Sequence, residues 1–288
     1  MYGHEFTIED LGINDDLGQY TLQGSVAPLL AIPSFKPSSI RTVSWQEETG
    51  MQAELSAPVF RSRDFQLKLW GSDLMSVWSA ASPQGYFTLS VENTLIDLSK
   101  CRLRGVSSYS ALNGVQSALF NITSDDDPRD LLDEYADYSP SGGASYTTPY
   151  SLYEPAFGNI GALGIQVLDG WRNTLAKPGD PKMPMTRDVS VSAGMLFDDV
   201  QTLSPKTSAR KISIPCLLHT GASLADFWAR YYCLLYWLTK PGEIIITQGV
   251  VSPSSLHCYY DSMTVNEYVP SEPVPWLKFT VNMNVLNY

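Results

Sequence analysis

The amino-acid sequence repeats itself across its two halves, and this repeat limits the possible folds more than any other feature. Residues 17–44 align without a gap to residues 163–190, and further matches follow in the same order, at an offset that grows from 146 to 159 residues. Insertions in loops would produce such a drift, so the series predicts two tandem copies of one domain. The matched pairs include Leu17/Leu163, Gly18/Gly164, Leu22/Leu168, Gly24/Gly170, Lys36/Lys182, Arg41/Arg187, Arg63/Arg210, Leu74/Leu224, Trp78/Trp228, Gly85/Gly242, Cys101/Cys258 and Phe120/Phe279.

The repeat also predicts where the domains begin and end. The first copy covers residues 1–128 and the second covers residues 157–288. Residues 129–156 between them are rich in Asp, Ser, Gly, Pro and Tyr, which is typical of a linker or an extended arm. Tyrosine is enriched at protein interfaces, so we expect an interface here, with packing of the linker or stacking on sugars as alternatives. The tyrosines are Tyr135, Tyr138, Tyr146, Tyr150 and Tyr153.

Each copy has the pattern of several strands and a single helix. Residues 277–285 alternate apolar and polar side chains, and this period of two predicts a strand with one buried face. Residues 65–69, 118–122 and 212–218 follow the same pattern, and the sequences EIIIT and YFTLSV predict further strands after glycine turns. Strands followed by one helix and then by more strands indicate an antiparallel sheet with a helix on its face or flank.

The helix is clearest in the second copy, where apolar residues recur at spacings of three and four. Ser223 is a good N-cap with Asp226 three residues on, and Pro241 and Gly242 predict the end of the helix. The helix of the first copy is expected to have only about two turns, because Pro83 follows it closely. So short a helix leaves part of the first sheet without cover, so we expect a neighbouring subunit or the linker to cover it. The residues expected to pack on the second sheet are Leu224, Phe227, Trp228, Tyr231, Leu235 and Leu238.

Composition argues against several classes of function. The net charge of −11 disfavours binding to nucleic acid or to anionic membranes, although it would help DNA to slide past without sticking. Four cysteines without a CxxC pair, with only three histidines, predict buried free thiols in a reducing compartment and no zinc site. No apolar run is long enough to span a membrane, and the N-terminus has no signal-peptide pattern. We expect no cofactor and no metal.

Candidate sites for chemistry each have a simpler structural interpretation. The aspartates at 125–127 lack the alternating ligands and central glycine of an EF-hand, so we expect a solvated turn or a helix N-terminus. His257 beside Cys258 suggests a nucleophile, but the repeat places Cys101 at the same position, which favours a buried strand cysteine. No G-x-S-x-G motif occurs, and nothing selects two carboxylates from 30 acidic residues. We therefore expect no enzyme.

Arginines recur at corresponding positions of the two copies, as Arg41 with Arg187 and Arg63 with Arg210. The simpler interpretation is a charge at a strand end with a local partner. The alternative is an ion pair between subunits, which would make these residues part of an interface.

The second copy resembles the tail-tube superfamily of bacteriophages, nearest to distal tail proteins and related baseplate components. The resemblance rests on an arginine before an alternating strand, a polar turn, a helix with a D-F-W motif, and an L..PG sequence before the next strand. It implies two tandem tail-tube-like antiparallel β-sandwiches or barrels, each flanked by a helix. The residues are Arg210, Ile212, Leu218, Asp226, Phe227, Trp228, Leu238, Pro241 and Gly242.

The resemblance implies a structural protein of the phage virion, assembled in the host cytoplasm. It would form a ring at the distal end of the tail that joins the tube to the baseplate or tip, with DNA crossing the lumen unbound. Its partners would be copies of itself and other tail proteins. A trimer of two-domain chains would supply six ring positions, and a hexamer would form two layers.

Two departures from the family, a second ring domain and a shortened helix in the first copy, keep other functions open. Typical distal tail proteins carry one ring domain and a different peripheral domain, whereas here the second half is another ring domain. Duplicated major tail-tube proteins and baseplate hubs are therefore alternatives. A carbohydrate-binding β-sandwich that attaches to host glycans is an alternative from another class.

Overall fold

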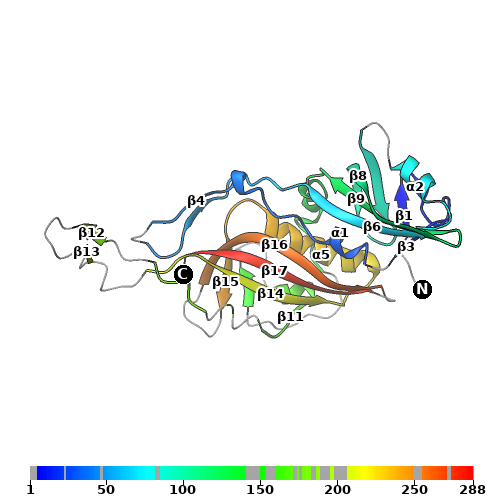
Figure 1. Ribbon diagram of the computed structural model, residues 1–288. Coiled ribbons are helices and arrows are strands. Elements are labelled where there is room, and N and C mark those ends of the chain that lie inside the picture. Colours follow the sequence, from blue (N-terminus) through cyan, green and yellow to red (C-terminus); the bar gives the residue numbers. More distant parts are fainter. Residues whose placement is uncertain are drawn as a thin grey trace.

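The computed structural model describes residues 5–22, 24–45, 48–81, 85–140, 150–153, 160–170, 174, 177–182, 186–188, 195–197, 206–248, 255–270 and 274–287. Within these residues the protein is mainly β, with two large antiparallel sheets, two short two-stranded sheets and few helices. Figure 1 shows the first large sheet at one end of the molecule, and the short strands β12 and β13 at the other.

The first large sheet has seven strands in the order β2-β1-β7-β8-β9-β6-β3. Its longest part is the β8–β9 hairpin, which turns at Asn113 and Gly114, both with positive φ. Alternation places Phe65, Leu67 and Leu69 of β6 on the buried face. The strands are β1 (Phe6–Ile8), β2 (Leu11–Gly12), β3 (Tyr20–Thr21), β6 (Arg63–Gly71), β7 (Phe87–Val91), β8 (Asp97–Leu112) and β9 (Val115–Ser124).

The second large sheet has six strands in the order β10-β15-β16-β17-β14-β11. If β2 is set aside, this order matches the first sheet strand for strand, with β10 in the place of β1 and β11 in the place of β3. The residues before β6 and β14 also form corresponding short hairpins. The strands are β10 (Tyr150–Tyr153), β11 (Ile165–Val167), β14 (Arg210–Leu218), β15 (Ile244–Gln248), β16 (Ser255–Val269) and β17 (Trp276–Asn287), and the hairpins pair β4 (Arg41–Val43) with β5 (Gln52–Glu54) and β12 (Thr186–Asp188) with β13 (Met195–Phe197).

Backbone bonds also recur at corresponding positions of the two units, which we define as residues 1–128 and 157–288. Glycines that the repeat matches share positive φ: Gly18 with Gly164, Gly24 with Gly170, and Gly85 with Gly242. Three backbone bonds of the first unit, each written from the N–H donor to the carbonyl acceptor, have an equivalent in the second. Leu22 to Lys68 corresponds to Leu168 to Pro215, Lys36 to Val59 corresponds to Lys182 to Lys206, and Arg61 to Ser34 corresponds to Ser208 to Asp180.

The last strand of each unit departs from the sequence alignment by two residues. The sequence alignment matches Phe120 to Phe279. In the first sheet Phe120 lies opposite Leu67 of β6. The residue of β14 that is equivalent to Leu67 is Ile214, and it lies opposite Val281. Phe279 therefore occupies the place of Ala118. A shift of two keeps every side chain on its face, so alternation alone could not detect it.

The helices differ between the units as expected. α2 (Leu74–Ala80) has about two turns and α5 (Leu224–Thr239) has more than four. The N-cap predicted for α5 is confirmed, because the Ser223 hydroxyl accepts a bond of 3.2 Å from the Asp226 N–H. The remaining helical segments are short: α1 (Ala27–Leu30), η1 (Pro37–Ser39), α3 (Arg129–Leu132), η2 (Asp133–Tyr135) and η3 (Ile160–Leu163).

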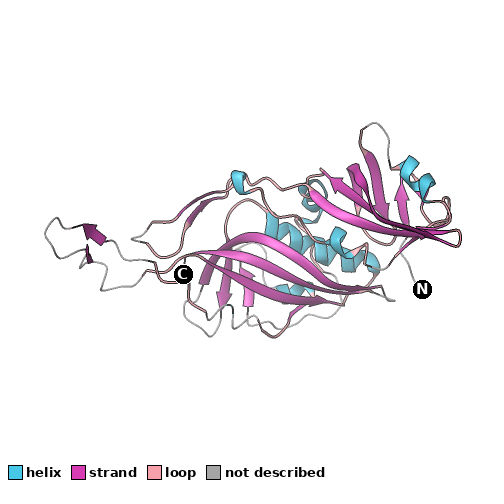
Figure 2. Cartoon of the chain, in the orientation of Figure 1, coloured by secondary structure: helices cyan, strands magenta, loops and turns pink. Residues whose placement is uncertain are grey.

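Helix α5 is buried on nearly every side and not only on one stripe. Of the six residues expected to pack on the second sheet, five are buried and Leu224 is half-buried. The opposite face of the helix carries Tyr232, Leu234 and Trp237, and these side chains are buried too. Figure 2 shows the helix between the two large sheets, and its Trp228 donates a 2.8 Å bond to Asn93 of the first unit. A helix that is apolar all round is typical of a protein interior.

The described residues do not confirm the expected tandem sandwiches. Each unit has one large antiparallel sheet, a two-stranded hairpin and a helix, and both units contribute to one continuous hydrophobic core. Leu132 of α3, near the start of the linker, is buried in the shared core and lines a cavity together with Leu98 of β8, so cover of the first sheet by the linker stays a prediction. Tyr232 of α5 lines that cavity as well, and Trp228 bonds to Asn93, so the second unit contacts the first in a way that the sequence did not predict.

Candidate assembly site

The β4–β5 hairpin of the first unit lies on the second unit and bonds to it through the backbone. The Gly50 N–H donates to the Thr207 carbonyl at 2.8 Å, and the Met51 N–H donates to the Leu286 carbonyl at 2.8 Å. The Gly242 N–H, just before β15, donates to Leu55 at 3.1 Å. The hairpin therefore does not project freely, although all of its strand residues are exposed or half-buried.

A small apolar cluster joins the two surfaces beside these bonds. Leu55, Tyr259 and Leu286 are buried together, with exposed fractions of 6%, 8% and 1%. Burial of one such side chain stabilises a contact by about 1.5–3 kcal/mol relative to exposure. The cluster is separate from the main core, so the hairpin forms a local contact of its own.

Lys182 of the second unit holds the loop of this hairpin. Its amino group donates to the carbonyl oxygens of Trp45, Glu48 and Gly50, the last at 3.0 Å. Three carbonyl acceptors satisfy the three donors of an ammonium group. The sequence gives one signal for this residue, because Lys182 matches Lys36 in the repeat, but that match does not indicate what the side chain binds.

A second contact between the units runs through α1 and two buried tyrosines. The Tyr231 hydroxyl of α5 donates to the Leu30 carbonyl at 2.8 Å, and the Tyr260 hydroxyl of β16 donates to Ile32 at 2.7 Å. Burial raises the pKa of both phenols well above the usual value, so they stay neutral donors. These bonds satisfy two carbonyls at the end of α1, which is inserted between the units.

The linker is fixed to α5 by Tyr138, whose hydroxyl bonds to a buried ion pair within that helix. Arg230 is fully buried and donates to Asp226 at 2.8 Å, and the Tyr138 hydroxyl donates to the same carboxylate. Burial opposes ionisation of Asp226, but the bonds from Tyr138, Arg230 and Ala222 outweigh it and lower the pKa of the carboxyl. Tyr135 packs on Tyr232 with ring centroids 5.5 Å apart.

The other candidate tyrosines are only partly described. Tyr150 and Tyr153 lie on β10, which pairs with β15 at the edge of the second sheet. Tyr146 lies outside the described residues. The interface role of the five tyrosines stays a prediction, although Tyr135 and Tyr138 are engaged within their own chain.

The four candidate arginines have two different placements. Arg63 begins β6 and Arg210 begins β14. The guanidinium of Arg63 donates to the Leu29 carbonyl at 2.9 Å, and that of Arg210 donates to the Thr174 carbonyl at 3.2 Å. Each acceptor lies about 35 residues before its arginine in the chain. Both arginines therefore lie at a strand end and bond to a partner within their own unit, as the simpler of the two interpretations expects. Arg41 on β4 is exposed, and Arg187 lies on β12, so the intersubunit role stays a prediction for these two.

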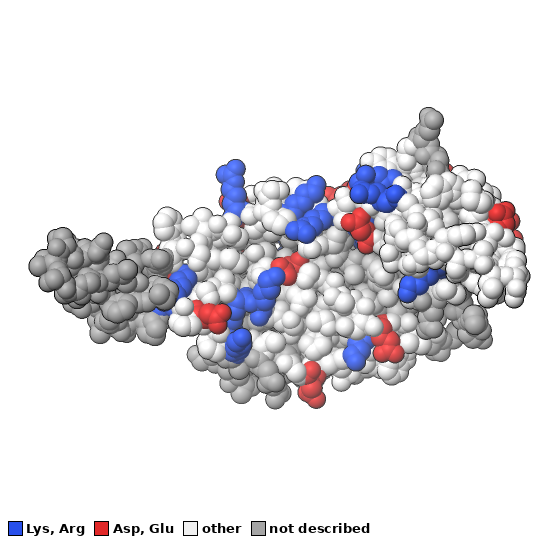
Figure 3. Space-filling model, viewed as in Figure 1, with Lys and Arg blue, Asp and Glu red and all other residues white. Residues whose placement is uncertain are grey.

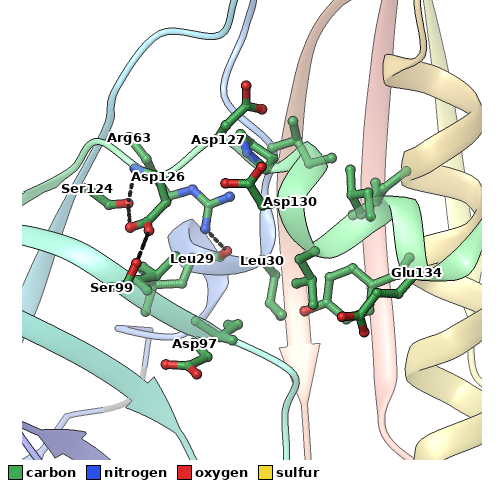
Figure 4. A pocket seen from close by; sticks show the side chains of 18 residues that line it. Leu29, Leu30, Arg63, Asp97, Ser99, Ser124, Asp126, Asp127, Asp130 and Glu134 are labelled. Carbon is green, nitrogen blue, oxygen red and sulfur yellow. Dashed lines mark hydrogen bonds between the residues drawn. The ribbon is translucent and has the colours of Figure 1, made fainter.

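A cavity of about 260 Å³ opens between the units beside Arg63. Figure 4 shows the Arg63 guanidinium donating to Leu29, with Asp126 bonded to Ser99 and Ser124 and with Asp97, Asp130 and Glu134 along the wall. In the part of the chain that is described, no three His, Cys, Asp or Glu side chains gather as metal ligands. The cavity lies where α1, α3 and α5 meet the first sheet.

The aspartates at 125–127 are each engaged by protein donors. Asp125 pairs with Arg102 at 2.9 Å, and Asp127 pairs with Arg129 at 2.6 Å. Asp126 accepts bonds from Ser99, Lys100 and Ser124. They sit between β9 and α3, so the turn at the start of a helix is confirmed.

His257 and Cys258 do not form a nucleophile pair. Their side chains leave β16 on opposite faces, and His257 pairs with Glu243 at 2.7 Å. Cys258 is fully buried, and burial raises the pKa of its thiol to about 12, which keeps it protonated. Cys101 is buried at the equivalent place, opposite Phe87 as Cys258 is opposite Ile244. The expectation of buried strand cysteines is confirmed.

The surface charges are mixed. Figure 3 shows basic and acidic side chains interspersed on one face, without a large patch of one sign. No described helix has the length and apolar character that crossing a membrane requires.

Comparisons with known proteins give little beyond this geometry. No protein-family model matches the chain, and no curated protein matches it. Among solved structures, the chain is similar to the phage SPP1 Dit (gp 19.1) protein, described as a paradigm of the hub adsorption apparatus of phages that infect Gram-positive bacteria. That alignment covers 98% of both chains at 6% identity, with a TM-score of 0.29. A likeness at this level carries no argument about function.

Proposed function

We propose that this protein is a non-enzymatic structural component of a phage tail, which forms a ring at its distal end around the DNA channel. The two units arose by duplication in this proposal, and three chains supply six ring positions. Other tail proteins bind the two faces of the ring and connect it to the tube and to the tip. The protein is then located in the virion.

The observation that carries the proposal is the repetition of one unit with a hairpin that docks on its neighbour. Apart from β2, the strand order is the same in both large sheets, and the hairpin of the first unit bonds to the body of the second through Gly50, Met51 and Lys182. A contact between similar units that faces one way along the chain can be continued by further copies.

The residues that carry the sequence resemblance occupy the places that the family pattern implies. Arg210 begins β14, Asp226 lies in the first turn of α5 with Trp228 two residues on, and Gly242 precedes β15. The net charge of −11 suits a channel that DNA must cross without binding.

Electron microscopy of the purified protein tests the proposal. We expect closed rings with a central hole of a few nanometres, with three chains in each ring by mass photometry. Long helical tubes would indicate a tube protein instead. Monomers that persist at high concentration, together with strong binding on a glycan array, would overturn the proposal in favour of a carbohydrate-binding module.

A further inference from the structure

We infer that the cavity beside Arg63 binds the free amino terminus of a peptide whose first side chain is apolar. Such a ligand has three parts, which are a primary ammonium group, the carbonyl group next to it and the apolar side chain. Each part has a counterpart in the wall of the cavity. Binding here does not require the ring, because the whole cavity lies within one chain.

The floor of the cavity is apolar and comes from several parts of the chain. The first sheet, α1, α3 and α5 each contribute side chains that are almost fully buried. The volume of about 260 Å³ leaves room for a branched aliphatic side chain, which gains by leaving water for such a surface. The residues of the floor are Leu29, Ile96, Leu98, Leu132 and Leu235.

Three carboxylates around the cavity have no basic partner. Asp97, Asp130 and Glu134 line it, and Figure 4 shows them on different sides of it. Within the described part of the chain, none of the three side chains forms an ion pair or a hydrogen bond. Carboxylates around an apolar hollow raise the local concentration of cations, and an ammonium group can donate to several of them at once.

The Arg63 side chain supplies a hydrogen-bond donor on the same wall. Its guanidinium is fixed by the bond of 2.9 Å to the Leu29 carbonyl, and Figure 4 shows it among the residues that line the cavity. Its Nε–H is buried and has no acceptor among the described residues, whereas buried donors normally have one. A carbonyl next to the ammonium group of a ligand would accept this bond.

The combination of groups disfavours other classes of ligand. A simple anion would meet Arg63 but would also face Asp97, Asp126, Asp130 and Glu134. A metal ion would find no cluster of three His, Cys, Asp or Glu ligands in the part of the chain that the structure describes. A simple alkylamine would use the carboxylates and the floor, but it would leave the Nε–H of Arg63 without an acceptor.

Calorimetric titration with small amines tests the ligand class. At about pH 6.5 an α-amino group is protonated, and leucinamide should then bind with one molecule per chain. Isopentylamine lacks the carboxamide and N-acetylleucinamide lacks the charge, so each should bind at least about tenfold more weakly, because each loses a hydrogen bond to a charged group. Leucine should also bind more weakly, because its carboxylate would face the acidic side chains.

Three results of this titration would overturn the inference. They are no binding of leucinamide, equal binding of isopentylamine, and tighter binding of leucine than of leucinamide.

Variants at the start of the linker test the place of binding. Asp130→Asn combined with Glu134→Gln should weaken the binding of leucinamide about tenfold, because two carboxylates that face the ammonium group become neutral. The matched control combines Asp133→Asn with Asp137→Asn, which removes the same charge at the same spacing from exposed residues outside the cavity. With unchanged melting temperatures, equal binding by the two double variants would contradict the proposed site.

A longer ligand tests whether the amino terminus belongs to a peptide. Leucyl-glycyl-glycinamide should bind as tightly as leucinamide, because the carboxylates at the cavity are exposed and the chain can continue into solvent. Loss of binding with the longer ligand would overturn the assignment to a peptide in favour of a free amino-acid derivative. None of these results bears on the ring, which electron microscopy tests separately.

Discussion

At the scale of single residues, the contact between Asp226, Arg230 and Tyr138 decides how the linker is held. Arg230 has no exposed side-chain surface, and the Asp226 side chain is 10% exposed. Removing one partner of a buried pair leaves the other charge without compensation, which costs more than the pair itself contributes. This pair also belongs to the capped first turn of α5, so it orients the helix as well as the linker.

Asp226→Asn should therefore lower the free energy of unfolding by about 3 kcal/mol at neutral pH. The folded-state pKa of this carboxyl is lowered, so its contribution is complete above the unfolded pKa of about 3.9 and is lost as pH falls through the folded pKa. The difference between variant and wild type should shrink accordingly in urea titrations at acid pH. Asp261→Asn, which changes a more exposed pair with Lys211, should cost less than about 1 kcal/mol.

At the scale of secondary-structure elements, α5 serves both units because no face of it is polar enough for solvent. Its counterpart in the first unit, α2, ends at Ala80 and contributes Leu74, Val77, Trp78 and Ala80 to the core. α5 of the second unit packs against the part of the first unit that the short α2 leaves without a helix. The asymmetry between the two helices therefore makes the units depend on each other.

Removal of the N-cap of α5 tests how much of its stability is local. Ser223→Ala should lower the free energy of unfolding by about 1 kcal/mol, because the first turn loses the acceptor for the Asp226 N–H. Ser110→Ala on the exposed β8–β9 hairpin should change it by less than about 0.5 kcal/mol. A Ser223 variant as stable as the Ser110 variant would show that tertiary packing alone holds this turn.

At the scale of the whole molecule, the two units share one core. Phe120 of the first sheet and Phe279 of the second belong to the same buried cluster, with α5 between them. The docked hairpin and α1 add contacts that cross the unit boundary. Two domains joined only by a linker would have separate cores.

The full chain should unfold in one cooperative transition. Calorimetry should give a ratio of calorimetric to van't Hoff enthalpy near one, because separating the units would expose the apolar surface of α5. A ratio near two, with separate melting steps, would contradict the shared core. Changing Tyr231 to Phe, which removes the bond to Leu30 between the units, should lower the single transition without splitting it.

Several features of the fold could be predicted from local sequence because their causes are local. The alternation in residues 277–285, the caps of α5 and the shortened helix of the first unit all depend on neighbours within a few residues. The repeat added long-range information, since equal sequences at equal spacing imply equal bonds. It matched glycines that the structure shows to have positive φ, and it favoured buried strand positions for Cys101 and Cys258.

The candidate site could be predicted only in part. The sequence singled out Arg63 and Arg210 by their recurrence, but recurrence does not show whether a partner lies in the same chain. It passed over Lys182 and Lys36, because a lysine in a polar turn has no distinctive pattern. What Lys182 binds is visible only in space, where the loop of the β4–β5 hairpin lies against its amino group.

The sequence by itself indicated two similar β-rich units, several of their strands, and where α5 begins and ends. Only the tertiary structure decided that α5 lies between the sheets, that the β4–β5 hairpin crosses to the second unit, and that Phe279 takes the place of Ala118 and not of Phe120. Periodicity fixes which face of an element is apolar, but it is unchanged by a shift of two residues and does not identify what covers that face. Those choices depend on contacts between residues far apart in the chain, and packing of the whole core selects among them.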